Sequence, residues 1–185
     1  MKKRAIAGMI LLLCLAACLR IYQVNEQYPQ TQTETVKMGE ILRLDDYDVI
    51  LLSWEWQDSS ILKEIAPGYS VMTDENGNDY PEEKERVVFA KLRITKTTNN
   101  HVAFHMENVA LESGGWNNQW DPILYETLNG TDSMVSLLKK GESREIIIPI
   151  ELYDFQFHKQ DWETVTQRQF YIVFENYPVK RMIKI

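Results

Sequence analysis

The stretch Arg86-Val-Val-Phe-Ala-Lys-Leu-Arg-Ile-Thr95 decides the fold class of this chain. One set of alternate positions is apolar throughout: Val88, Ala90, Leu92 and Ile94. The positions between them carry charge at Lys91 and Arg93. Successive side chains of a β-strand point to opposite faces, so this alternation predicts a strand with one face in a core and the other in water.

Similar short runs, separated by turn residues, follow along the rest of the chain. Strands are predicted at residues 40–44, 47–57, 86–95, 102–111, 142–152, 169–175 and 179–185, with weaker candidates at 71–73, 123–126 and 134–138. Pro149 places the strand at 142–152 at a sheet edge or a bulge. Short helices are predicted at 60–66 and around 160–165. Seven to nine short strands at this spacing predict an all-β antiparallel sandwich.

Two segments also resemble known proteins. Val88–Asn99 (VFAKLRITKTTN) has the form of a strand and turn, and Leu138–Ser143 (LKKGES) leads into an apolar strand. Together with Phe170–Phe174, these motifs resemble small Ig-like lipoproteins of Gram-positive bacteria, which are largely of unknown function. The resemblance covers roughly residues 39–185 and implies an Ig-like sandwich on an extracytoplasmic tether, with no active site. Lys96 stands where the resemblance predicts Asn.

The N-terminus has the composition of a bacterial export signal. A basic head at residues 2–4 precedes the unbroken apolar run Ala5–Leu13. Leu15-Ala-Ala-Cys18 resembles the lipobox, in which the cysteine receives a diacylglyceryl thioether and becomes the new N-terminus. The sequence therefore predicts a signal peptide at residues 1–17 and lipidation of Cys18.

An uncleaved signal anchor is the alternative. The apolar run Ala5–Leu19 has 15 residues, which is short of the roughly 20 that a spanning helix needs. A snorkelling Arg20 would let the span extend to Val24. Cys14 is a poorer lipid acceptor than Cys18, because a bulky leucine precedes it. Both alternatives place the folded part at the extracytoplasmic face of the cell membrane.

Residues 18–38 are predicted to form the lipidated N-terminus and a flexible tether, and residues 39–185 the sandwich domain. A chain beginning at Cys18 would carry 17 basic and 27 acidic residues, a formal charge of −10. Such a surface argues against nucleic acid as a partner. Both cysteines precede the domain, so an apolar core must stabilise it without disulfides.

The sequence contains no recognisable catalytic or cofactor motif. We therefore expect a binding module that is not an enzyme and that needs no cofactor. His101 and His105 would lie about 13 Å apart in an extended strand, too far for one zinc ion. Asp74–Glu85 resembles a calcium loop, but Asp79 stands where the turn needs glycine, and Asn76-Gly77 favours a hairpin turn.

The segment Gly114-Gly-Trp-Asn-Asn-Gln-Trp120 supplies the predicted binding site. Flat indole faces stack on sugar C–H surfaces, and amides bond to hydroxyl groups. The predicted site residues are Trp116, Asn117, Asn118, Gln119 and Trp120. The alternative is that the two indoles cap the core. A bound partner would be an envelope glycan or a membrane protein, and the rival function is an extracellular hydrolase or a calcium-dependent binding protein whose site the fold assembles. Trp162 is predicted to pack inward or to form a partner surface.

Overall fold

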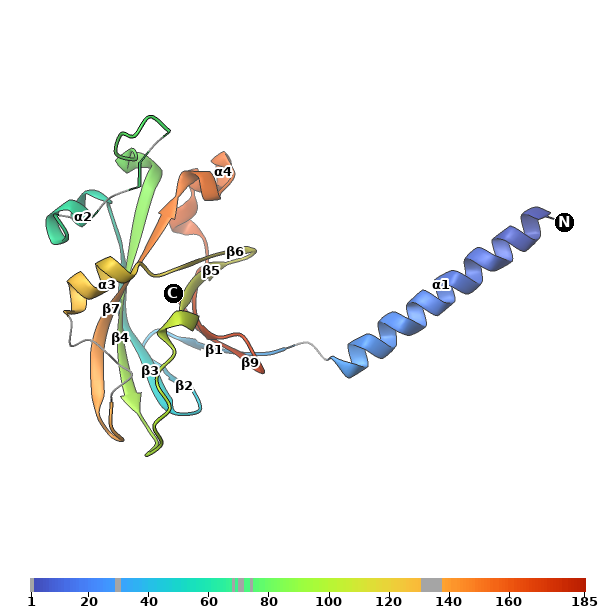
Figure 1. Cartoon of the computed structure of the whole chain (residues 1–185), viewed down its shortest axis with the longest axis horizontal. Coiled ribbons are helices and arrows are strands. Elements are labelled where there is room, and N and C mark those ends of the chain that lie inside the picture. Colours follow the sequence, from blue (N-terminus) through green and yellow to red (C-terminus); the bar gives the residue numbers. More distant parts are fainter. Residues whose placement is uncertain (1, 29–30, 68, 70–71, 74, 131–137) are drawn as a thin grey trace. The chain divides into compact units, whose positions relative to one another are not determined.

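A computed structural model describes every residue of the chain except 1, 29–30, 68, 70–71, 74 and 131–137 (Figure 1). The chain divides into two units, Met1–Gln32 and Thr33–Ile185. The first unit contains helix α1 (Lys2–Gln27), in which Gly8–Gln27 is long and apolar enough to cross a membrane. A signal sequence has the same length and composition, so α1 is consistent with both export predictions.

The second unit is built from two sheets. Across the described residues, one sheet has five strands in the order β1-β9-β8-β5-β6, and the other has four in the order β2-β3-β4-β7. The strands of the first are β1 (Gln32–Lys37), β5 (Ala110–Ser113), β6 (Trp116–Gln119), β8 (Tyr171–Glu175) and β9 (Val179–Lys184). Those of the second are β2 (Ile41–Arg43), β3 (Tyr47–Gln57), β4 (Glu85–Lys96) and β7 (Ser143–Tyr153).

The four central strands follow the immunoglobulin pattern. Strand β4 pairs antiparallel with β7 in one sheet, and β5 pairs antiparallel with β8 in the other. The chain therefore passes from one sheet to the other between β4 and β5, and again between β7 and β8. Strands B to C and E to F do the same in immunoglobulin domains. This topology confirms the predicted antiparallel Ig-like β-sandwich.

The hydrophobic core lies between the two sheets. The alternate apolar residues of β4, which are Val88, Ala90, Leu92 and Ile94, are all fully buried. Neighbouring strand β7 adds Ile146, Ile148 and Ile150, and the five-stranded sheet adds residues that include Leu111 and Ile172. The period-two prediction for this stretch is therefore confirmed residue by residue.

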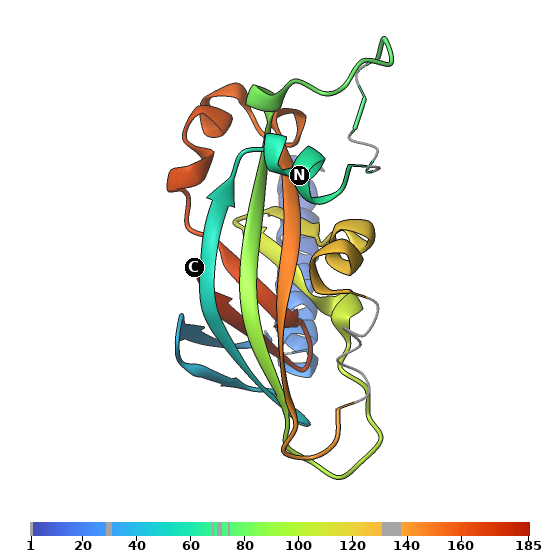
Figure 2. The same ribbon diagram turned by 90° about the vertical axis from the view of Figure 1, so that its left-hand side faces the viewer.

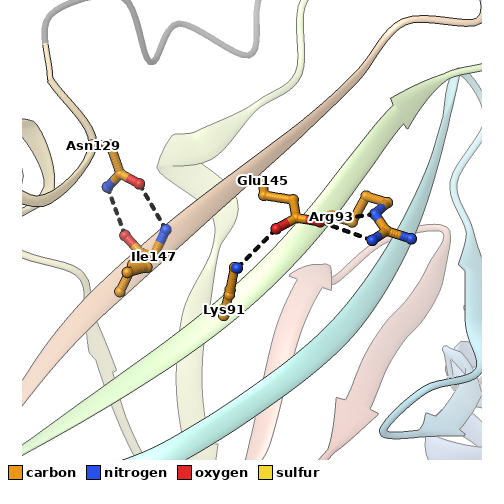
Figure 3. Close-up of polar contacts among 5 residues, drawn as sticks. All are labelled: Lys91, Arg93, Asn129, Glu145 and Ile147. Carbon is orange, nitrogen blue, oxygen red and sulfur yellow. Dashed lines mark hydrogen bonds and ion pairs between the residues drawn. The ribbon is translucent and has the colours of Figure 1, made fainter.

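Strand β7 is the outer strand of its sheet, as Pro149 predicts. The side chain of Asn129 occupies its free edge: Nδ2 donates to the Ile147 carbonyl at 2.8 Å, and Oδ1 accepts from the Ile147 N–H at 2.7 Å (Figure 3). On the exposed face nearby, Glu145 pairs with Lys91 at 2.8 Å and with Arg93 at 2.7 Å (Figure 3).

In the described part of this unit, three short helices accompany the sheets: α2 (Ser60–Ile65), α3 (Pro122–Asn129) and α4 (Lys159–Glu163). Single 3-10 turns lie at Glu82–Lys84, Met106–Asn108, Asp154–Gln156 and Val165–Gln167. Figure 2 looks onto β3, β4 and β7 side by side, with α2 and α3 on the outer side of this sheet and α4 near one end. The predicted helices at 60–66 and 160–165 are confirmed to within two residues.

The strand prediction at 123–126 is wrong, because these residues lie in α3. Asp121 caps this helix by accepting a hydrogen bond from the Leu124 N–H at 2.8 Å, and Pro122 occupies its first turn. Most of the strand predicted at 102–111 is absent, since this segment contains the 3-10 turn at 106–108 and joins the sheet only at Ala110. The candidate strand at 134–138 lies, apart from its last residue, outside the described residues, as does Val71 of the candidate at 71–73.

Residues 32–37, which the sequence places in the flexible tether, form β1 in the structure. Thr33, Thr35 and Val36 are β-branched, which suits a strand, and β1 lies beside β9 in the sheet. Glu34 also reaches Arg181 of β9 at 3.5 Å. The polar composition that predicts a tether is equally compatible with an edge strand, because such a strand keeps most of its surface in water.

Candidate functional site

The five residues predicted to form the glycan site do not face one way. They lie along β6 and the residue after it, where alternate side chains point to opposite faces. Trp116, Asn118 and Trp120 are half-buried, whereas Asn117 and Gln119 are exposed. The strand therefore separates the indoles from two of the three amides.

Trp120 packs into the sandwich. Its indole N–H donates to the Met106 carbonyl at 2.8 Å, and its ring lies 4.9 Å from that of Tyr125. The indole N–H thus has a hydrogen-bond partner and the ring has a packing partner within the fold. Trp120 therefore has the core-capping position that the alternative interpretation assigned to it.

Trp116 lies at the border between the core and a surface hollow. Its ring centroid is 5.9 Å from that of the buried Phe170 and 5.0 Å from that of Phe157. The hollow has a volume of about 520 Å³. It is lined by Gly115, Trp116, Phe155, Gln156, Phe157, His158, Asp161 and Arg168. The β5–β6 turn thus meets the segment between β7 and β8 at this hollow.

Arg168 brings a positive charge to the aromatic wall of this hollow. Its guanidinium carbon lies 5.4 Å from the centre of the Phe157 ring, within the range of a cation–π contact. The same guanidinium lies 3.8 Å from the Asp161 carboxylate and donates to the Ser113 hydroxyl at 3.3 Å. These contacts hold the side chain across the ring instead of leaving it free in solvent.

A second hollow of about 560 Å³ adjoins the first at Phe157. Its lining comprises Glu83, Lys84, Asp154, Phe157, Lys159, Trp162 and Glu163. The Phe157 ring is 5.9 Å from that of Trp162, and the Arg86 guanidinium lies 5.8 Å from the Trp162 ring. The two ring contacts of Phe157 therefore join three side chains into a continuous row, which we call the aromatic row: Trp116, Phe157 and Trp162.

Reasoning from the sequence missed Phe157 as a site residue because it lies 41 positions from Trp116 and meets it only in the folded chain. A local signal was present in the density of aromatic residues between Tyr153 and Trp162. Trp162, predicted to pack inward or to form a partner surface, packs against Phe157 and also lines a hollow; its role as a partner surface stays a prediction.

The amides line a different hollow, of about 380 Å³, together with Glu107 and Glu112. Asn118 donates to the Glu151 carbonyl at 2.7 Å, and Gln119 donates to the Glu107 carbonyl at 2.9 Å. Both amides thus bond to the backbone of neighbouring segments. The structure does not bring them together with the aromatic row.

The candidate metal ligands do not converge. His105 bonds Glu107 at 2.7 Å on the surface, in the irregular segment that replaces the predicted strand. In the calcium-loop candidate, Asp74 lies outside the described residues, and Glu85 is fully buried. Within the part of the chain that the structure describes, no three His, Cys, Asp or Glu side chains are grouped closely enough to hold a metal ion.

Three solved structures have similar architecture. An uncharacterized beta-sandwich protein from Clostridium difficile 630 is 14% identical and aligns over 84% of this chain and 96% of its own, with a TM-score of 0.47. A conserved hypothetical protein from Bacillus anthracis is 16% identical over 80% and 94% of the two chains, with a TM-score of 0.51. A putative lipoprotein from Bacillus subtilis is 12% identical over 78% of this chain and 38% of its own, with a TM-score of 0.48.

At this identity, the likeness to the Bacillus anthracis protein shows a shared fold and nothing about activity. No curated protein matches the sequence. A family model does, and its span agrees with the structural unit that begins at β1. The model, described as a domain of unknown function (DUF5028), matches residues 32–181, and the chain belongs to this family.

Proposed function

We propose that the protein is a binding module tethered at the extracytoplasmic face of the cell membrane, and that it recognises an envelope glycan at the aromatic row. The observation that carries the proposal is the hollow in which Trp116, Phe157 and Arg168 meet. Aromatic faces beside a few fixed polar groups are the usual lining of a small-ligand site. Sugar rings offer matching C–H surfaces and hydroxyl groups.

The position of the hollow in the folded unit supports this proposal. The α4 segment, which forms part of its wall, lies toward one end of the sandwich, and β1 lies in the other half (Figure 1 and Figure 2). Because β1 is where the chain enters the folded unit, a tether joined there leaves the aromatic row free. The aromatic row could then contact a long ligand at the end of the sandwich that lies away from the tether.

The contacts inside the hollow favour binding over hydrolysis. Glycoside hydrolases use two carboxyl groups that face each other across the bond to be cleaved. Asp161 is paired with Arg168 at 3.8 Å instead of with a second acid. We therefore propose that the charges of the hollow orient a ligand and do not cleave it.

The tether that we propose is a diacylated Cys18. Its support is the Leu-Ala-Ala-Cys sequence together with the apolar α1, on which Cys18 is exposed. Two acyl chains hold a protein stably on a bilayer, whereas one chain does so only marginally. In a bacterial host, Cys18→Ser should abolish incorporation of labelled fatty acid, and Cys14→Ser should leave it unchanged. An uncleaved anchor would instead yield unlabelled protein of full length in both variants.

Co-sedimentation of the full-length protein with purified bacterial cell walls, in detergent micelles, tests the glycan proposal. Wild-type protein should pellet with the walls, and Phe155→Ala and Arg168→Gln should weaken pelleting. Both residues line the hollow, and Phe155 is 58% exposed, so its loss leaves the core intact. Tyr177→Ala is the matched control, because this exposed aromatic residue lies in the β8–β9 turn.

Equal pelleting of all variants would contradict the assignment of the site. Failure of the wild-type protein to pellet would contradict glycan as the ligand and favour a membrane-protein partner. Repeating the experiment with a calcium chelator tests the calcium-dependent alternative, since binding at the aromatic row requires no ion.

A further inference from the structure

Two carboxyl groups are buried together on the outer face of the four-stranded sheet. Glu85, the first residue of β4, is fully buried, and Glu151 of β7 is 7% exposed. In the β4–β7 register, Glu85 lies opposite Tyr153 and Val87 lies opposite Glu151. The two acids are therefore diagonal neighbours on one face of adjacent strands.

The two carboxyl groups differ in their hydrogen bonds. Glu151 accepts hydrogen bonds from the hydroxyl groups of Tyr69, at 2.9 Å, and Tyr153, at 3.1 Å. Both carboxyl oxygens of Glu85 are buried without a hydrogen-bond partner among the described residues, and so is the hydroxyl of Ser59, which precedes α2. An unpaired buried carboxylate is costly, so this geometry favours a bound proton.

The groups that face this pair are mostly neutral or acidic. They come from every element packed around it: Tyr153 from β7, Ser59 and Lys63 from the α2 segment, Tyr69 from the chain after α2, Asp121 from the start of α3, and Tyr80 with Asp154 beside Tyr153. Lys63 is the basic residue of this set, and its ammonium pairs with Asp79 at 3.2 Å. None of the ion pairs formed by the described residues includes Glu85 or Glu151.

We propose that the buried pair Glu85 and Glu151 binds a proton and acts as a pH-sensitive latch that keeps α2 and the Tyr69 side chain closed over the sheet. This proposal does not depend on the proposed glycan site, and it stands whichever ligand the protein binds. Loss of the proton places two like charges in a buried site where the facing cation, Lys63, is already paired with Asp79, and the entry of water is the simplest way to relieve their repulsion.

Among the described residues, α2 and the Tyr69 side chain, which together we call the cover, are attached through an apolar cluster and a few polar contacts. Under α2 lies a small apolar cluster that is separate from the main core: Leu62, Ala66, Val87 and Leu124. Tyr69 links the cover to two acids at once, because its hydroxyl lies 2.9 Å from Glu151 and 3.1 Å from Asp121. Opening would expose the cluster while the sandwich core stays intact, since local openings cost less than global unfolding.

Burial determines the pH range of the latch. It raises the pKa of Glu151 to about 7 and also raises the pKa of Glu85. In an open form, water would return both groups toward the usual value of 4.5. The closed form therefore binds protons more tightly, and its advantage is lost as the pH rises from about 4.5 through 7.

Hydrogen exchange of the full-length protein in detergent micelles, followed by mass spectrometry, tests this proposal. After correction for the intrinsic effect of pH, the amides of residues 59–66 should open about tenfold or more often at pH 8.5 than at pH 5.5, since each unit of pKa difference corresponds to a tenfold change. The amides of β4 between Val88 and Ile94 should show no such change.

Glu151→Gln should remove this pH response, because the neutral amide still accepts from Tyr69 and Tyr153 and carries no charge. Glu85→Gln removes the like charge beside Glu151 but leaves Glu151 buried, so it should weaken the response, and it serves if the first variant does not fold. Glu145→Gln is the matched control: it makes the same change on the same strand at an exposed site and should keep the wild-type response. Equal protection of wild-type α2 at both pH values, or a wild-type response in the two buried-site variants, would overturn the latch.

Discussion

The ammonium of Lys96 lies 4.3 Å from the centre of the Tyr47 ring, and the Lys96 side chain is almost completely buried. Its Nζ donates to the Asn100 side-chain oxygen at 2.8 Å and to the Val102 carbonyl at 2.7 Å. The Tyr47 hydroxyl donates to the same carbonyl at 2.8 Å. The residue that departs from the resemblance to Ig-like lipoproteins thus organises the chain that leaves β4.

Lys96→Met is expected to destabilise the protein by about 1–3 kcal/mol. Methionine fills a similar volume, but it leaves the Asn100 and Val102 oxygens without their charged donor. Urea unfolding of the variant and of Lys91→Met, a half-buried lysine in the same strand, would measure the difference. Equal stability of Lys96→Met and wild type would show that the buried ammonium contributes nothing beyond its volume.

Asn129→Ala is expected to cost about 1–3 kcal/mol of unfolding free energy, because it leaves the Ile147 N–H and carbonyl without partners. It also uncovers part of the β7 edge, so the variant should self-associate more readily. Thermal unfolding and light scattering provide the two measurements. Asn117→Ala, which removes an exposed amide, should change neither one, and a monomeric, fully stable Asn129→Ala would contradict the edge-covering role.

Overall stability should also depend on pH through Glu151. Because burial raises its pKa to about 7, the folded state binds this proton more tightly than the unfolded state does. Stability should therefore fall as the pH rises from 5.5 to 8, by about 2 kcal/mol. Chemical denaturation across this range measures the slope, and Glu151→Gln should flatten it. An unchanged slope in that variant would assign the pH dependence to other groups.

The folded unit should need β1. Arg181 of β9 joins Glu34 of β1 at 3.5 Å and Asp45 at 3.1 Å, and it also pairs with Glu175. A fragment beginning at residue 39 lacks Glu34 and the half-buried Val36, so it should be about 1–3 kcal/mol less stable than one beginning at residue 31. Calorimetry of the two fragments would decide this. Identical unfolding temperatures would mean that residues 32–37 serve only as a tether.

The sequence predicted the elements whose signal is local. The alternation in β4 depends only on neighbouring residues, and β3 (Tyr47–Gln57) was predicted with its observed ends. The failures share a physical cause as well. Residues 123–126 are apolar enough for a strand, but the Asp121 cap and Pro122 begin a helix whose buried face packs under α2. Such short apolar runs are ambiguous until their packing partners are known.

For the site, composition grouped side chains that the structure directs to different faces of one strand. The sequence singled out Trp116 to Trp120 as one surface, because two indoles and three amides lie close together in the chain. In the structure, β6 directs Asn117 and Gln119 to the face opposite the indoles and places Trp116 against Phe157. Whether a tryptophan packs inward or meets solvent depends on what covers it, and no local pattern contains that information.

By itself, the sequence determined that this chain has an apolar N-terminal segment suited to export or anchoring, followed by an acidic, cysteine-free, mainly β domain. These properties follow from composition and, in the strands, from the period of two residues, and both can be recognised within a short stretch of sequence. Only the tertiary structure decided which strands are neighbours, and hence that Glu85 lies against Glu151, that Lys96 is buried on Tyr47, and that an aromatic row forms at the end of the sandwich. Each of these contacts joins residues distant in the chain, so it exists only once the sheets have paired and packed.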